Sequence, residues 1–154
     1  MNIGRQWEDR LRIWAEQFGK HYVKKAAALE LTGFTTMEHL AFDQAVKGHF
    51  SPAPRGMTWG KKWEYGWFHT AFTVPVELEG KRLVLHMGCG EEMLVWVNGT
   101  ESGAIDKKHK FITLTRSAKT GDSYEIYAEC YAGHGIRNEG HFAQCPKTDT
   151  VSAF

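Results

Sequence analysis

Residues 90–109 read GEEMLVWVNGTESGAIDKKH, and this stretch decides the fold. An apolar run from Met93 to Val97 leads directly into Asn98-Gly99, after which the chain continues toward a polar pair, Asp106 and His109. Asn-Gly after such a run is a strong signal for a two-residue β-hairpin, because both residues adopt positive φ readily. The stretch therefore predicts a hairpin, and the apolar character of Met93–Val97 on both faces predicts a central strand that is covered on each side.

Segments on either side of this hairpin alternate between apolar and polar residues, as strands with one buried face do. The alternating segments are residues 67–74, 83–87 and 124–131. Pro75 is expected to end the first of them, and Ile126, Ala128 and Cys130 are expected to face the core in the last. Short strands that follow one another at roughly 8–14-residue intervals, with turn residues between them, predict a mainly β fold, an antiparallel β-sandwich or jelly roll.

The first residues have the spacing of an amphipathic helix. Apolar side chains recur at steps of three and four, and they are Ile3, Trp7, Leu11, Trp14 and Phe18. Charged residues occupy the opposite face, and Gly19 is expected to end the helix. A helix of about four turns cannot bury this stripe by itself, so the stripe must pack against another element or another molecule.

The chain of 154 residues is expected to form one domain with a helical appendage. We divide it into an N-terminal helix at 1–20, a β-sandwich domain at 21–135 and a linker at 136–154. Within the sandwich domain, residues 26–31 fit either a first strand or a helical extension, and residues 37–45 fit a short helix. The remaining segment, residues 51–60, contains two prolines and two glycines and fits a loop.

Composition excludes several classes of function. Lys plus Arg (19) nearly equals Asp plus Glu (18), so no basic surface for nucleic acid or an anionic membrane is expected. No segment approaches the roughly 18 apolar residues of a membrane span, and the first ten residues lack a signal-peptide pattern. Three cysteines are an odd number in a chain too large to need disulfides. A cytoplasmic location is therefore predicted.

Two pairs of residues are candidates for contact with a carbohydrate. Trp59 and Trp63 fit a sugar platform, because aromatic faces pack against the C–H face of a pyranose, and they also fit a plug at the open end of a sandwich. Asp106 and His109 fit a polar pair that hydrogen-bonds a sugar or faces the cleft of a catalytic domain. The alternative for this second pair is a turn cap, in which Asp106 accepts hydrogen bonds from backbone amides.

Neither a metal site nor a catalytic site is predicted. The weak metal candidates are Cys130, His134, His141 and Cys145. Their spacing fits no known zinc finger, and Cys130 is expected to face the core. Glu91 and Glu92 are adjacent on a strand entrance and point to opposite faces, so they cannot form the carboxylate pair of a glycosidase. No cofactor is therefore expected on this chain.

Several short motifs occur together in a characteristic order. They are Trp59-Gly60, Trp67-Phe68, Phe72-Thr73-Val74-Pro75, the strand and turn from Glu92 to Gly99, Asp106 with His109 after Gly103, and Tyr131-Ala132-Gly133-His134. By this series the chain resembles, over roughly residues 55–135, the N-terminal galactose-binding-like β-sandwich domain of glycoside hydrolase family 38 α-mannosidases. The helix at the start of the chain is also consistent with that family.

The resemblance implies a parent enzyme whose separate catalytic domain binds zinc or another divalent metal and cleaves α-mannosides with retention, through an Asp nucleophile. That machinery has no counterpart in these residues. We therefore expect a non-catalytic N-terminal accessory domain that is inactive alone. Its expected partners are the catalytic domain and a mannose-containing oligosaccharide. The alternatives are a stand-alone carbohydrate-binding module, suggested by Trp59 and Trp63, and an oligomerisation module that forms a homo-oligomer, suggested by the helix stripe.

Overall fold

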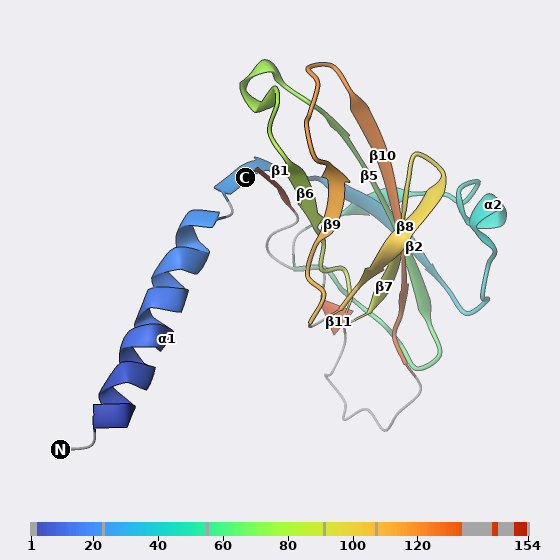
Figure 1. The fold of residues 1–154 in the computed structure, drawn as a ribbon. Coiled ribbons are helices and arrows are strands. Elements are labelled where there is room, and N and C mark those ends of the chain that lie inside the picture. Colours follow the sequence, from blue (N-terminus) through green and yellow to red (C-terminus); the bar gives the residue numbers. More distant parts are fainter. Residues whose placement is uncertain are drawn as a thin grey trace.

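Two antiparallel sheets face each other across one apolar core. The structure, a computed structural model, describes residues 3–22, 24–54, 56–90, 92–106, 108–133, 143–144 and 150–153. A long helix, α1 (Ile3–Tyr22), precedes the sheets, and Figure 1 shows it extending away from them. The mainly β, antiparallel architecture with an N-terminal helix confirms the fold predicted from the sequence.

The larger sheet has six strands in the order β3-β2-β5-β10-β7-β8. Their bounds are β2 (Leu31–Thr36), β3 (Ser51–Ala53), β5 (Tyr65–Thr73), β7 (Met93–Val97), β8 (Thr100–Ile105) and β10 (Ser123–Tyr131). The nine-residue strands β5 and β10 pair along their whole length in the middle of the sheet. The predicted hairpin is the β7–β8 pair, and its turn residues Asn98 and Gly99 have φ of 50° and 76°, as a type I′ turn requires.

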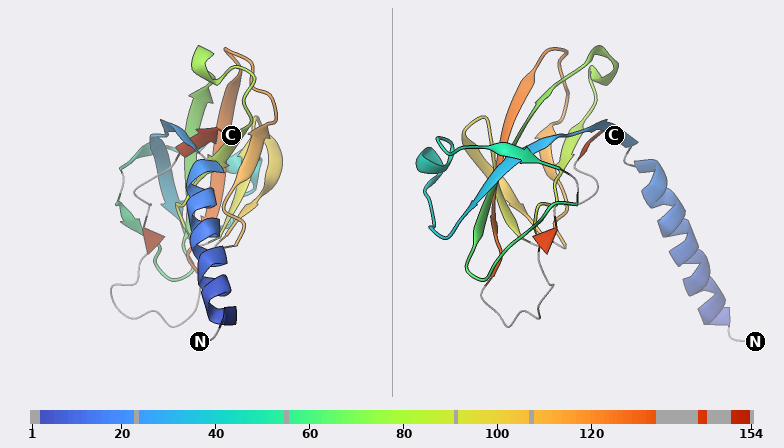
Figure 2. Two further views of the ribbon diagram at one scale, coloured as in Figure 1. Left: turned by 60° about the vertical axis from the view of Figure 1, so that its left-hand side comes forward. Right: turned by 180° about the vertical axis from the view of Figure 1, so that it is seen from behind.

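The smaller sheet has four strands in the order β1-β12-β6-β9. Their bounds are β1 (Lys24–Ala28), β6 (Leu83–His86), β9 (Ile112–Thr115) and β12 (Thr150–Ala153). The strands β4 (Thr58–Trp59) and β11 (Ala143–Gln144) pair with each other and form a separate two-stranded sheet. A short 3-10 helix, η1 (Val76–Leu78), follows Pro75. Strands from both ends of the chain thus lie side by side, as Figure 2 shows for the C-terminal strand and the blue β1.

The core lies between the two sheets and is built by the inward side chains of alternating strands. On β10 these are Ile126, Ala128 and Cys130, each fully buried as predicted. The smaller sheet contributes Leu83, Leu85 and Val151, which are also fully buried; the buried cluster is continuous across both sheets. At about 25 cal/mol per Å² of apolar surface, this burial is the main source of stability.

A second apolar cluster covers the outer face of the six-stranded sheet. The short helix α2 (Phe42–Ala45) and its flanking loops lie over Trp67 and Trp96 there. The Phe42 ring stacks on Trp96 with ring centroids 5.0 Å apart. Strand β7 therefore has Met93 and Val95 in the main core and Trp96 in the second cluster, which explains why its sequence is apolar on both faces.

Several sequence-based boundaries are wrong. Helix α1 continues through Gly19 to Tyr22, because a single glycine weakens a helix without ending it. Residues 26–31 contain the end of β1 and the first residue of β2, in line with the strand alternative, and the helix expected at 37–45 is confined to α2. The predicted loop at 51–60 contains β3 and β4. Pro52 is tolerated in β3 because that strand lies at the edge of its sheet.

The segment predicted as a linker, 136–154, contributes strands to the fold. Strand β12 lies between β1 and β6, so it has a hydrogen-bonded neighbour on each side, and Val151 within it is fully buried. Strand β11 pairs with β4. The sandwich therefore extends past the predicted boundary at residue 135. Among the described residues, no helix has the length and apolar character needed to cross a membrane.

Candidate functional site

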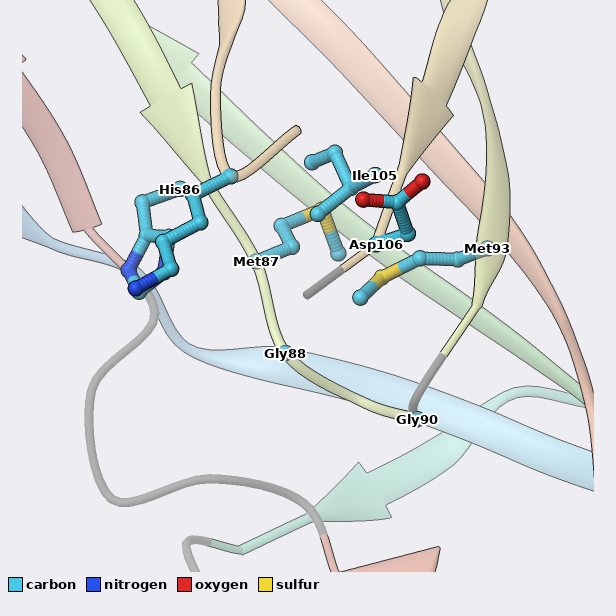
Figure 3. Close-up of a pocket in the computed structure, with 8 residues that line it drawn as sticks. His86, Met87, Gly88, Gly90, Met93, Ile105 and Asp106 are labelled. Carbon is cyan, nitrogen blue, oxygen red and sulfur yellow. The ribbon is translucent and has the colours of Figure 1, made fainter. Parts of the chain in front are cut away.

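One end of the sandwich holds an open pocket of about 300 Å³. Three segments converge on it: the end of β6 with the loop that follows, the first residue of β7, and the end of β8 with its turn (Figure 3). The lining residues are His86, Met87, Gly88, Gly90, Met93, Ile105, Asp106 and Lys110. The pocket is thus assembled by the β7–β8 hairpin of the larger sheet and by β6 of the smaller sheet, and the predicted site residue Asp106 belongs to it.

The floor of the pocket is apolar and belongs to the core. Met87, Met93 and Ile105 are buried, with exposures of 1%, 4% and 3%, and each belongs to the main core. Gly90 lets the loop approach that core closely, because a Cβ there would lie 3.2 Å from the Cβ of Cys130. The Met side chains supply a polarizable surface that adapts to an apolar ligand face.

Asp106 is fixed by a turn that it caps itself. Its Oδ1 accepts hydrogen bonds from the backbone N–H groups of Lys108 and His109, each at 2.6 Å, and its Oδ2 lies 3.0 Å from His109 Nδ1. The His109 side chain and these amides stabilise the ionised carboxylate and lower the pKa of Asp106 to about 2. The same carboxylate raises the pKa of His109 above its usual value.

This geometry is that of the turn cap, one of the two alternatives open for Asp106 and His109. His109 is exposed and points away from the core, with 76% of its side chain accessible. The contact of this pair with a sugar or with a catalytic cleft stays a prediction. Oδ2 of Asp106 has one hydrogen-bond partner among the described residues, so it retains capacity to accept from a ligand hydroxyl.

Two further polar residues that line the pocket, His86 and Lys110, were not singled out in the sequence analysis. Figure 3 shows His86 across the pocket from Asp106. Burial lowers the pKa of His86, and the positive charge of Lys110 lowers it further, so the imidazole is neutral at neutral pH. Its ring packs against Phe111, with centroids 5.4 Å apart. The signal that points to His86 is its place at the end of the alternating segment 83–87, where strand ends of a sandwich border open loops.

The two candidate tryptophans have different environments. Trp59 is 4% exposed and its indole Nε1 donates a 2.7 Å hydrogen bond to the carbonyl of Cys89, so its ring is part of the core and offers no face to solvent. Trp63 is 52% exposed and has a positive φ of 70°. The structure thus separates these two residues, and of the pair only Trp63 is placed where a sugar ring could reach it.

The weak metal candidates are not brought together by any described contact. Cys130 is buried on β10 with a free thiol, and His134, His141 and Cys145 lie outside the described residues. Within the described ranges, no three His, Cys, Asp or Glu side chains are grouped as metal ligands are. The prediction for His134, His141 and Cys145 therefore stays untested, and the resemblance places its divalent metal in the catalytic domain.

The described lining residues give the pocket the chemistry of a binding site. Glycoside hydrolysis commonly uses two carboxylates that flank the scissile bond. Asp106 is the single carboxylate among the described residues that line this pocket, and its charge is already stabilised by its own turn. What the arrangement can do is hold a small polar molecule between an apolar floor and a polar rim.

Comparison with known proteins connects this fold to a family. A family model described as "Alpha-mannosidase, jelly roll domain" matches residues 26–150. Alpha-mannosidase 2C1 of Mus musculus is 30% identical over 133 residues, which cover 84% of this chain and 13% of that protein. The Homo sapiens Alpha-mannosidase 2C1 is 27% identical over 128 residues, which cover 80% of this chain and 12% of that protein. The chain thus spans about an eighth of the length of these curated relatives.

Solved structures share the fold at low sequence identity. A Bacteroides uniformis β-glucuronidase superposes with a TM-score of 0.58 at 11% identity, covering 85% of this chain and 18% of that one. A β-glucuronidase from an uncultured Clostridium species gives a TM-score of 0.56 at 13% identity, covering 85% and 28%. These similarities concern the fold alone.

Proposed function

The chain belongs to the family of α-mannosidase jelly-roll domains, and from this premise we propose that it is the non-catalytic N-terminal accessory domain of an α-mannosidase. The observation that carries the proposal is the match of the family model across residues 26–150. The chain also covers only 13% of the length of the mouse relative, so most of that protein lies outside the matched region. The described residues supply no metal-ligand group and no carboxylate pair in the pocket, which supports assigning the chemistry to a catalytic domain outside these residues.

In this role the sandwich docks on the catalytic domain and borders its sugar cleft. The zinc or other divalent ion of such an enzyme would be held by the catalytic domain. The proposal includes a cytoplasmic location, which the free, buried thiol of Cys130 supports, because a buried reduced cysteine suits a reducing compartment.

The proposal is tested by assaying the purified chain with an aryl α-mannoside, with and without added zinc. We expect no turnover in either condition. The second arm mixes the chain with the catalytic domain of the parent α-mannosidase, expressed without the jelly-roll domain, and we expect a stoichiometric complex with higher activity or stability than the catalytic domain alone. Metal-dependent turnover by the isolated chain, or failure of the two polypeptides to associate, contradicts the proposal.

A second candidate function, binding of a mannose-containing oligosaccharide, is favoured by the pocket itself. Its volume of about 300 Å³ is at the lower end of the range for ligand sites and is sufficient for one sugar ring. Mannose and short mannose oligosaccharides are titrated into the ¹⁵N-labelled chain, and the NMR chemical shifts of the backbone amides are followed. The amide signals around Met93 and Ile105, which line the pocket, should shift. Those around Thr73, at the other end of the sheet, should stay unchanged. Unchanged spectra at millimolar sugar remove this candidate.

A further inference from the structure

The pocket between β6 and the β7–β8 hairpin carries two opposite charges, which are held in different ways. Among the described residues that line it, the side chains charged at neutral pH are Asp106 and Lys110. Figure 3 shows the Asp106 carboxylate beside Met93 and across the pocket from His86. How firmly each charge is held decides which class of ligand the pocket accepts, because only a fixed charge acts on a ligand without first moving away from it.

The negative charge of Asp106 is fixed in position by its turn. The backbone N–H of Asp106 donates to the His109 carbonyl at 3.0 Å, and Oδ1 accepts from the N–H groups of Lys108 and His109 at 2.6 Å each. Hydrogen bonds from the His109 side chain and from these amides lower the pKa of Asp106 to about 2, so the carboxylate is ionised at neutral pH. Its side chain is 38% exposed, which leaves the charge within reach of a ligand.

The described positive charges near the pocket lie in solvent. Lys110 is exposed, and a lysine ammonium on its four-carbon stem is mobile and strongly hydrated. The side chain of His109, whose pKa is raised by Asp106, is 76% exposed. Burial and the charge of Lys110 lower the pKa of His86, so this imidazole adds no positive charge at neutral pH. Because water and salt screen exposed charges, Lys110 and His109 offset the charge of Asp106 only in part.

The apolar floor strengthens the effect of the fixed charge. Met87, Met93 and Ile105 are buried in the core, so one side of the pocket is a wall of low dielectric constant. Such a wall focuses the field of a neighbouring charge across a concave site. An anion placed on this floor would lose part of its hydration and would face Asp106 with no fixed cation to pair with. A hydroxyl group, in contrast, can donate a hydrogen bond to Oδ2 of Asp106.

We propose that the pocket selects an uncharged sugar ring and rejects uronic acids, and that Asp106 sets this selectivity. The inference rests on the binding function proposed above for the pocket, and it adds which class of sugar is accepted. In the bound state a sugar hydroxyl donates to Oδ2 of Asp106, and C–H groups of the ring contact Met93 and Ile105. The same carboxylate repels a carboxylate on the sugar. Asp106 is thus a specificity residue of a binding site and takes part in no reaction.

The test compares three ligands: methyl α-mannoside, the corresponding mannosiduronate, and the methyl ester of that uronate, which has nearly its shape without its charge. Kd is measured by NMR titration of the full ¹⁵N-labelled chain, followed at the amides around Met93 and Ile105. Repulsion between unit charges about 6 Å apart corresponds to roughly 3–100-fold in Kd, depending on screening. Because the exposed cations offset part of it, we expect the Kd of the uronate to exceed that of the mannoside at least about threefold. The ester should bind as the mannoside does.

Four variants connect the selectivity to individual charges. Asp106→Asn keeps an acceptor oxygen for the turn and removes the charge, so the ratio of the uronate Kd to the mannoside Kd should fall to about one, as in a double-mutant cycle. Lys110→Gln and His109→Gln remove the offsetting cations and should raise this ratio. Glu101→Gln is the matched control: it changes the net charge as Asp106→Asn does, on β8 and outside the pocket lining, and should leave the ratio unchanged.

The outcomes separate this inference from the proposed binding function. If none of the three ligands shifts the pocket amides of the wild type, the binding function fails and the inference fails with it. If the mannoside binds and the uronate binds as tightly, only the charge selectivity is overturned. Equal weakening by the uronate and its ester identifies a steric limit and overturns it too, as does an Asp106→Asn ratio equal to that of the wild type. If the amide spectrum shows that Asp106→Asn is unfolded, unchanged ratios in both Lys110→Gln and His109→Gln refute the inference, and raised ratios support it.

Discussion

Replacement of Asn98 tests the residue on which the central hairpin depends. Asn98 has a φ of 50° at the first position of the turn. Its side chain also connects the turn to β10: Oδ1 accepts a 2.7 Å hydrogen bond from the Glu125 amide, and Nδ2 donates to the Ser123 carbonyl at 3.3 Å. Alanine at this position would lose both the tolerance for positive φ and the two hydrogen bonds.

The expected loss follows from these two contributions. An L-residue other than Gly, Asn or Asp in the left-handed region costs about 1–2 kcal/mol. The short hydrogen bond to Glu125 is worth about 1 kcal/mol net, and the longer one adds little. Asn98→Ala should therefore lower the free energy of unfolding by about 2–3 kcal/mol. Asn98→Gly keeps the backbone conformation and loses only the side chain, so it should cost about 1 kcal/mol.

The assay is urea-induced unfolding of the wild type and both variants, followed by tryptophan fluorescence. The unfolding midpoint should fall in the order wild type, Asn98→Gly, Asn98→Ala, with an unchanged dependence on urea concentration if the transition stays two-state. Equal losses for the two variants would show that positive φ is no constraint at this turn. The reasoning from the hairpin signature would then be refuted, although the strand pairing itself could stand.

Three further predictions concern the core and the pocket rim. Trp59→Phe removes the indole N–H that donates to the buried Cys89 carbonyl and should destabilise the fold by about 1–3 kcal/mol in the same urea assay. Gly33→Ala places a Cβ 2.7 Å from a ring carbon of Phe68 and should cost about 1–3 kcal/mol, measured as a lower Tm. The pKa of Asp106 is about 2 in the folded protein, which is below its value in the unfolded chain. The ionised carboxylate therefore stabilises the fold above about pH 4, and this contribution is lost as the pH falls toward about 2. Asp106→Asn should therefore flatten the acid limb of the Tm–pH curve, and an unchanged limb contradicts the turn-cap geometry.

Features that depend on neighbouring residues were predictable from sequence. The β7–β8 hairpin is specified by Asn98-Gly99, and the alternation in β10 correctly identifies Ile126 and Cys130 as core residues. Amphipathic spacing likewise identifies α1. In each case the decisive physical property, positive φ or a period of two or 3.6, lies within a few consecutive residues. Asp106 was found for the same reason, because its turn is local.

Features that depend on distant partners were missed, and the smaller sheet shows why. Strand β12 has only four residues, too few for a period of two to be distinguished, and its stability comes from pairing with β1 and β6. Trp59 lies in a two-residue strand within a Pro- and Gly-rich segment, so composition predicts a loop where packing against Phe68 buries the ring. The pocket combines both cases: its rim residue Asp106 is set by local turn geometry, and His86 joins it because β6, in the smaller sheet, ends near β8, in the larger sheet. Local signals thus identify which residues are special, and only the tertiary pairing decides which of them meet.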